Sequence, residues 1–594
     1  MLGKVFCSGL LGCAVLMPQL ASAVTEEGFE LLWGDTHLHT AMSGDAIARG
    51  VLLEPDTAYR FARGEPVVSN SGQTAQLARP LDWIVIADHG NNMGAGLVRH
   101  KLKQNPAFAE TALGRLWMDA RQLLAKGHLE AQALDEQALL PAHRSWQASF
   151  RAPAFRRSIW QRVGEQADRY NDPGTFTAFI GYEWTPSQEQ GSSEHRVVLF
   201  ADNASKTDQI LPFTSYDSAF EEDLWSSLDR YERLTNGRAI AIPHNSNLTS
   251  GQMFARQDSW GLPLSAHYAL LRARFEPVVE VTQIKGDSET HPYLSPEDPF
   301  ADFETWDGWT GRRQSDAPIR KQELPAEYTR SALKTGLALE RTIGANPYRF
   351  GVIGSTDSHT GLATADEDNF WGKSLPAEPS KDRMANQSAV LNWQMAAAGY
   401  AAVWAKQNTR AAIFEALLAR RVYATTGPRI SVRFSAAVGE RRVAMGGQLA
   451  CHEDSPVFKV GALKDPLNAN LDRIQIIKGW LDEAGQARER IFDVALSDGR
   501  EDGRIPVGST VDLQRASYTN DIGSPMLEAT WRDPDRSPGE KAFYYARVLQ
   551  IPTPRWTLYD KVRYAIDQVP EQVPMVLQER AYTSAIFTAS NCGA

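Results

Sequence analysis

The chain has 594 residues, of which 43% are hydrophobic and 23% are charged, and its formal net charge is −10. One hydrophobic core stops growing at roughly 250–300 residues, so at least two domains are expected. The composition excludes a fibrous or largely disordered chain. The mild negative charge argues against a nucleic-acid partner, which requires a clustered basic surface.

Residues 1–23 have the features of a secretory signal peptide. Lys4 precedes an apolar stretch over residues 5–17, and Ala21-Ser22-Ala23 forms a small-residue cleavage site. A lipoprotein signal ending at Cys13 is a weaker alternative, because the apolar stretch continues beyond it. No later apolar run reaches about 20 residues, so we expect no integral membrane span. The sequence predicts an exported, periplasmic protein.

Two cysteines, Cys451 and Cys592, remain in the mature chain. A disulfide between them is one interpretation, since an oxidising compartment allows it. Two unrelated thiols are the other.

From residue 24 to about residue 434, short apolar runs alternate with longer helical patterns. This alternation is typical of βα units around a largely parallel sheet. A charged stretch over residues 97–170, rich in Ala, Leu and Gln, predicts inserted helices that could cover a site. A further helix is predicted over 409–418, with Thr409 as its N-cap. The expected strands are 81–87, 176–182, 196–200, 239–242, 277–281 and 350–354.

Residues 435–594 show a different pattern, in which apolar and polar residues alternate. Segments 458–460, 474–477 and 543–548 are predicted antiparallel strands, and Asp498-Gly499 and Asp502-Gly503 are predicted turns. We therefore expect a β-rich, sandwich-like C-terminal domain.

Side chains suited to metal binding recur at the ends of these strands. His37 and His39 form an HxH motif, and residues i and i+2 of a strand project to the same face. Loops at the carboxyl ends of parallel barrel strands converge, so the other groups are expected to join this pair. The candidate ligands are His37, His39, Asp45, His89, Glu183, His195, His244, Asp357 and His359.

A single strand-end histidine or aspartate is more often a hydrogen-bonded structural group, and only the whole set favours a metal centre. His195 is the weakest candidate, because it precedes its strand instead of following it. The mixture of imidazole and carboxylate suits Mn²⁺, Fe²⁺ or Zn²⁺ better than Ca²⁺ or Mg²⁺.

HxH also opens the amidohydrolase barrels, which bridge two metals with a lysine and finish with a lone aspartate. Here Glu183 better fills the bridging position, and the last motif is Asp357-x-His359. The ordered set resembles the PHP (polymerase and histidinol phosphatase) superfamily of phosphoesterases. Further segments are similar to an exported PHP-like family of unknown function: 33–39, 195–200, 243–247 and 423–429.

The resemblance implies a distorted seven-stranded (β/α)7 TIM-like barrel and two or three divalent metal ions. Such ions activate a water that attacks a small anionic ester, here most simply a phosphate monoester or small diester. Glu183 would bridge the ions, and Asp357 or His359 would orient the water. Lys285 and Arg429 are the leading candidates for contact with the substrate anion. A further candidate is Arg196.

Three alternative functions remain open. A sulfate-ester hydrolase would use a similar site, because sulfate and phosphate are both tetrahedral anions. A C–N hydrolase is disfavoured by the missing bridging lysine. A catalytically silent metal- or ligand-binding module is disfavoured, because inactive relatives commonly lose one or more ligands, whereas every expected position here holds a competent residue.

Overall fold

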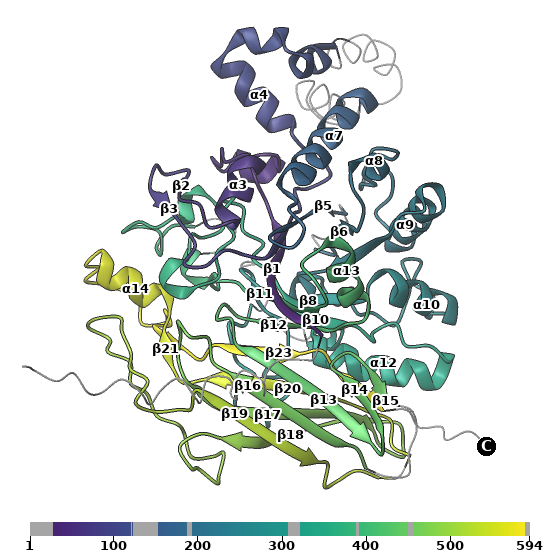
Figure 1. Cartoon of the computed structure of the whole chain (residues 1–594), viewed down its shortest axis with the longest axis vertical. Helices are drawn as coiled ribbons and strands as arrows, with labels where there is room; N and C mark the ends of the chain where they lie inside the picture. The colour runs from purple at the N-terminus through teal and green to yellow at the C-terminus, as the bar shows by residue number, and fades with distance from the viewer. Residues whose placement is uncertain are drawn as a thin grey trace, which may run out of the picture.

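The computed structural model describes residues 28–119, 122, 152–186, 193–306, 321–387, 391–449, 455–537 and 539–588. The expected signal peptide and both cysteines of the mature chain lie outside these residues, so their predictions stay untested. Helices α4 (Ala95–Gln104) and α7 (Pro153–Tyr170) lie at one end of the molecule, and the C-terminal sheets lie at the opposite end (Figure 1). Among the described helices, none is both long and apolar enough to cross a membrane.

One mixed sheet of 13 strands connects the two halves of the chain. Its path runs in the order β15-β24-β20-β23-β12-β11-β1-β4-β5-β6-β7, and β17 and β18 branch from β20. The N-terminal strands of this sheet are β1 (Glu30–Leu38), β4 (Trp83–Ile86), β5 (Thr177–Trp184), β6 (Arg196–Phe200), β7 (Ala239–Pro243), β11 (Tyr400–Ala405) and β12 (Val422–Thr425).

The expected largely parallel sheet is only partly right. β1, β4 and β5 are parallel neighbours, but β6 is antiparallel to both β5 and β7. Strand β11 is likewise antiparallel to β1. The β5–β6 case has a simple cause, because residues 185–195 are too few for the crossover of about a dozen residues that parallel neighbours need.

The expected (β/α)7 barrel is not seen as a closed sheet among the described strands. The main sheet ends at β7, while β8 (Val278–Gln283), β10 (Gly351–Gly354) and β9 (Gly286–Asp287) form a separate three-stranded sheet. β10 runs parallel to β8 and approaches β11, where Gly399 N donates to Ser355 O at 3.1 Å. The fold is therefore a mixed α/β arrangement with an incomplete ring of strands.

The strands that position the site are buried along their length. All residues of β4, β5 and β6 are buried, which explains why apolar residues predominate in them. Gly34 of β1 pairs with Trp83 of β4, and a Cβ atom at Gly34 would meet the indole ring at 2.2 Å. Only glycine at this position lets the Trp83 ring lie across the neighbouring strand.

The predicted helix near residue 409 is confirmed as α13 (Arg410–Leu418). Its N-cap Thr409 accepts a hydrogen bond from Ala412 N at 3.2 Å. The predicted helical stretch 97–170 contains α4 and α7 in its described part. The other α-helices whose full bounds are described are α2 (Gly44–Ala48), α3 (Pro55–Ala62), α8 (Ala204–Thr207), α9 (Glu221–Thr235), α10 (Ala266–Phe275), α12 (Thr329–Ile343) and α14 (Trp556–Arg563).

The C-terminal part is rich in β-strands that form two facing layers. The Phe458 ring of the β14-β13-β16-β19 sheet lies 4.5 Å from the Tyr544 ring of β20 in the main sheet. The expected boundary between residues 434 and 435 falls inside β13, and the division into domains stays a prediction. These strands are β13 (Ser431–Val438), β14 (Arg441–Ala444), β15 (Gln448–Leu449), β16 (Val457–Leu463), β17 (Leu471–Leu481), β18 (Ala487–Leu496), β19 (Met526–Arg532), β20 (Ala542–Gln550), β23 (Arg580–Thr583) and β24 (Ile586–Thr588).

A buried ionic network joins the segment after β9 to the C-terminal strands. Asp298 accepts hydrogen bonds from Arg330 Nη2 of α12 at 2.8 Å and from Arg547 Nη2 of β20 at 2.7 Å. All three side chains are fully buried. Removing one member would leave an unpaired buried charge, so this network fixes the segment against the C-terminal part.

Candidate metal centre

The site begins where the strand ends meet. Leu38 at the end of β1 forms a parallel bridge with Ser358, and His39 N donates to Ser358 O at 2.8 Å. His89, after β4, forms a parallel bridge with Glu183 of β5. The bridge between Leu38 and Ser358 brings His39 beside Asp357 and His359, which lie more than 300 residues further along the sequence.

Glu183 lies at the centre of the cluster and is fully buried. Its Oε1 lies 2.6 Å from His195 Nδ1 and 3.0 Å from His244 Nε2. Its Oε2 lies 2.9 Å from His89 Nδ1 and 3.2 Å from His39 Nε2. One carboxylate thus faces imidazoles from four different segments.

The position of His195 before its strand has a structural explanation. Because β6 runs antiparallel to β5, the start of β6 lies at the same edge of the sheet as the end of β5. His244 N donates to His195 O at 3.3 Å, which fixes the two histidine segments beside each other. The structure therefore brings His195 into the cluster.

The HxH pair presents its Nε2 atoms toward the same carboxylates. His37 Nδ1 lies 3.0 Å from Glu280 Oε2, and His39 Nδ1 lies 2.7 Å from Ser43 Oγ. Both Nε2 atoms lie 3.5 Å from Asp357 Oδ1. A partner at Nδ1 fixes the tautomer that leaves Nε2 as a lone-pair donor, which is how metal-ligating histidines are oriented.

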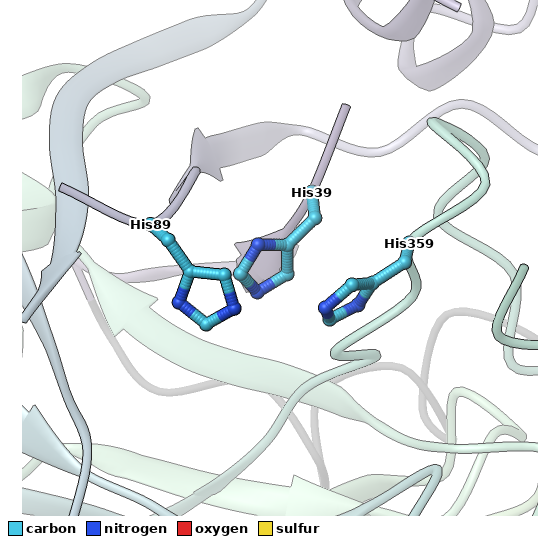
Figure 2. Close-up of side chains that lie close together, drawn as sticks. All are labelled: His39, His89 and His359. Carbon is cyan, nitrogen blue, oxygen red and sulfur yellow. The ribbon is translucent and has the colours of Figure 1, made fainter. Parts of the chain in front are cut away.

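A second group of ligands lies beside the first. Figure 2 shows the rings of His89, His39 and His359 side by side, with His39 in the middle. The His39 and His359 rings are stacked with centroids 3.9 Å apart. Asp45 lies across from this row, 2.9 Å from His359 Nε2 and 3.4 Å from His89 Nε2.

The loop that carries Asp357 and His359 is fixed by a buried carboxylate. Asp35 accepts hydrogen bonds from His37 N at 2.9 Å and from Thr356 N at 3.1 Å. Asp357 itself has φ of 50°, in the left-handed region that non-glycine residues rarely adopt. Such a conformation is maintained only where the surroundings hold it, and it is common at functional sites.

The electrostatic balance keeps Glu183 and His39 in states that can bind metal. Burial raises the pKa of Glu183, but the nearby charges of His89 and His195 outweigh it and lower this pKa well below its usual range. Burial also lowers the pKa of His39 well below its usual value. Glu183 is therefore ionised and His39 neutral, as ligands must be. Burial lowers the pKa of His89, but the carboxylates of Glu183 and Asp45 outweigh it and raise this pKa to about 10, so His89 would release a proton on binding an ion.

Several buried ligand atoms have no hydrogen-bond partner among the described residues, including His37 Nε2, His39 Nε2 and Glu183 Oε2. An imidazole lone pair facing a carboxylate oxygen is favourable only when a cation lies between them, and buried polar atoms are rarely left unpaired. The residues therefore fit metal ions. Four groups have ligand atoms within 4.8 Å of one another: His39, His89 and His359; His37, His39 and Glu183; His37, His244 and Glu280; and Glu183, His195 and His244.

Two lysines face the ligands across a small cavity of about 100 Å³. Lys373 Nζ lies 3.0 Å from Asp357 Oδ1 and 3.1 Å from His359 Nδ1, and Lys285 Nζ contacts Asp357 Oδ2. Burial lowers the pKa of Lys373 to about 8. Burial and the neighbouring Lys373 lower the pKa of Lys285 well below its usual value. Arg49 also lines this cavity, so Arg49 and Lys373 make one side of it basic.

A family model described as "Protein of unknown function (DUF3604)" matches residues 26–590. The chain belongs to the DUF3604 family. No curated protein matches it. Among solved structures, it is similar to a two-domain protein from Bacteroides vulgatus ATCC 8482 that contains a predicted PHP-like metal-dependent phosphoesterase, at 11% identity and a TM-score of 0.30, with 87% of this chain and 91% of that chain covered. The predicted relation to a family of unknown function is confirmed, and membership of the PHP superfamily stays a prediction.

Both arginines predicted for substrate contact lie elsewhere in this DUF3604 protein. Arg429 Nη2 donates to Arg79 O at 3.0 Å, and its backbone N donates to Asp465. Arg196 is fully buried and pairs with Glu276 at 3.0 Å. Neither lines the metal cavity. Proximity to a strand end was an insufficient criterion, because an arginine there can equally point outward into the surrounding packing.

The sequence interpretation missed Glu280 and Lys373. Glu280 interrupts the apolar run of β8, and a carboxylate inside a fully buried strand is a signal that could have identified it. Lys373 follows Gly372 in a loop outside any strand or helix, so no periodic pattern indicates its position. Only the fold brings it to Asp357.

Proposed function

We propose that this DUF3604 protein is a metal-dependent hydrolase that cleaves phosphoester bonds with a metal-activated water. The observation that carries the proposal is the buried Glu183 carboxylate, which faces imidazoles from four segments. Beside it, the Nε2 atoms of His37 and His39 have no hydrogen-bond partner among the described residues. The predicted ligands His37, His39, Asp45, His89, Glu183, His195, His244, Asp357 and His359 would hold two or three ions such as Mn²⁺, Zn²⁺ or Fe²⁺.

When bound, divalent ions lower the pKa of a water and polarise the ester oxygens. The protein contributes the orientation of its ligands. Glu280 and Ser43 fix the rings of His37 and His39, so both Nε2 atoms point to one place. Glu183 would share its two oxygens between ions, because its Oε1 and Oε2 face different histidines.

The cationic side of the cavity favours an anionic ester. Lys285, Lys373 and Arg49 line the same small space as His359 and Asp357. Cations fixed in place before reaction stabilise charge that develops on a phosphoryl group at little reorganisation cost. A neutral amide substrate would gain less from them, so the lysines favour ester over C–N hydrolysis.

The test combines elemental analysis of the purified protein with rates on p-nitrophenyl phosphate, bis-p-nitrophenyl phosphate and p-nitrophenyl sulfate. We expect at least two metals per chain and turnover of a phosphate ester that disappears on chelation. A preference for the sulfate would replace phosphoesterase by sulfatase. Bound metal without hydrolysis of any ester would support the silent binding module.

A further inference from the structure

A second cavity adjoins the metal centre. It has a volume of about 540 Å³ and shares Asp45 and His89 with the metal cavity. Small-molecule sites typically measure about 300–1,000 Å³, so the metal cavity of about 100 Å³ holds little more than the reacting group. The rest of a substrate must extend into a neighbouring space, and two predicted ligands of the metal centre also line this cavity.

One wall of this cavity is basic. Helix α4 contributes Arg99, His100 and Lys103, and residues i and i+4 lie on the same helix face. Arg99 and Lys103 are exposed and His100 is half-buried. Among the described residues that line the cavity, Asp45 is the one carboxylate, and it belongs to the metal centre. We call this space, between α2, α4 and Thr185, the α4 pocket.

The opposite wall is polar and fixed in place. Asn91 Nδ2 donates to Thr185 O at 3.2 Å, and Tyr216 Oη donates to Asn92 Oδ1. These contacts hold the turn after His89 against the neighbouring loop. The pocket is therefore supported by packed groups on the side next to the ligands and is basic on the side formed by α4.

The other large cavity has a different character. It measures about 640 Å³, lies beside Trp306 and contains Arg555. The Arg555 guanidinium is already paired with Glu304, at 2.8 Å between Nη2 and Oε2. The cavity beside Trp306 contains none of the predicted ligands, whereas the α4 pocket shares Asp45 and His89 with the metal cavity.

We infer that the α4 pocket binds a second anionic group on the leaving portion of the substrate, a carboxylate or a further phosphate. The inference rests on the proposed function in one respect, since it places the reacting phosphoryl group at the metal centre. Arg and Lys near a cleft raise the local concentration of an anion and pair with it by charge-assisted hydrogen bonds.

The test measures binding and requires no turnover. Isothermal titration of the metal-loaded protein compares unbranched alkylphosphonates with phosphonates of the same chain length that end in a carboxylate or in a second phosphonate. The series of chain lengths covers the span from the metal centre to α4. We expect the doubly anionic ligand of best length to bind about tenfold more tightly, as for one charge-assisted contact.

The variant Arg99→Gln/Lys103→Gln should remove this preference and leave binding of the plain alkylphosphonate unchanged. Lys101→Gln is the matched control, because Lys101 lies on the same helix but pairs with Glu54 at 2.7 Å and does not line the pocket. It should retain the preference. Better binding of the carboxylate series or of the bisphosphonate series identifies the kind of anion.

Two results would overturn the inference: equal binding of singly and doubly anionic ligands by the wild type, or an undiminished preference in the double variant. Failure of the proposed function would look different. In that case no ester would be hydrolysed, while the double variant would still lose its preference for the second anion.

Discussion

Replacement of Glu280 tests whether the metal centre depends on how its histidines are oriented. Glu280 Oε2 lies 3.0 Å from His37 Nδ1, and neither side chain is exposed to solvent. Glu280→Gln keeps the shape and an oxygen acceptor but removes the charge. A hydrogen bond to a charged group contributes about 1.5–3 kcal/mol and a neutral one about 0.5–1.5 kcal/mol, so the loss is about 1–1.5 kcal/mol. This corresponds to about a tenfold weaker binding of the ion nearest His37.

The assay is competition between chelator-stripped protein and a chelator of known affinity, with Zn²⁺ or Mn²⁺. Glu280→Ala should weaken binding by about 10–100-fold, because it also frees the His37 ring to rotate. Glu415→Gln serves as the control, since Glu415 is an exposed carboxylate that pairs with Arg238 on the surface. If both Glu280 variants remain folded and bind metal like the wild type, the assigned orienting role of Glu280 is wrong.

Three further outcomes are expected. His37→Ala or Glu183→Ala should lose metal and esterase activity together, measured by elemental analysis and p-nitrophenyl phosphate turnover, whereas His267→Ala on the exposed face of α10 should lose neither. Stripping the metals should lower the Tm measured by calorimetry by at least about 5 °C, because ions that bind only the folded state stabilise it. Their removal also leaves a cluster of buried groups whose charges are no longer neutralised. An unchanged Tm would contradict a resident metal. Burial raises the pKa of Asp287 from 3.8 to about 7, so the folded state favours the protonated carboxyl. The contribution of this group to the free energy of unfolding is complete below the unfolded pKa and is lost as the pH rises through about 7. Asp287→Asn should thus gain stability relative to wild type between about pH 4 and 7, by roughly 4 kcal/mol at most, in urea unfolding, while the exposed Asp302→Asn should give no such trend.

The sequence predicted which candidate side chains come together better than it predicted the fold that assembles them. Strand-end positions identified His89 and Glu183 because buried apolar runs mark the strands and the polar residue that follows must lie at their edge. Strand direction was not readable, so His195 looked out of place until β6 proved antiparallel to β5. Lys373 lies in a loop with no periodicity, and Arg429 follows a strand but turns toward Arg79.

Because one sheet runs through both parts of the chain, a cut at the expected domain boundary near residue 434 would separate paired strands. Strand β12 pairs with β23 through residues 423–425 and 581–583. The N-terminal part of the chain, residues 24–434, therefore obtains one of its strand neighbours from the C-terminal part. Expression of residues 24–434 alone would leave that edge with unpaired N–H and C=O groups, which is a template for aggregation. The two parts should therefore melt in a single cooperative transition, and a fragment designed to isolate the candidate metal centre needs to carry the β23 segment with it.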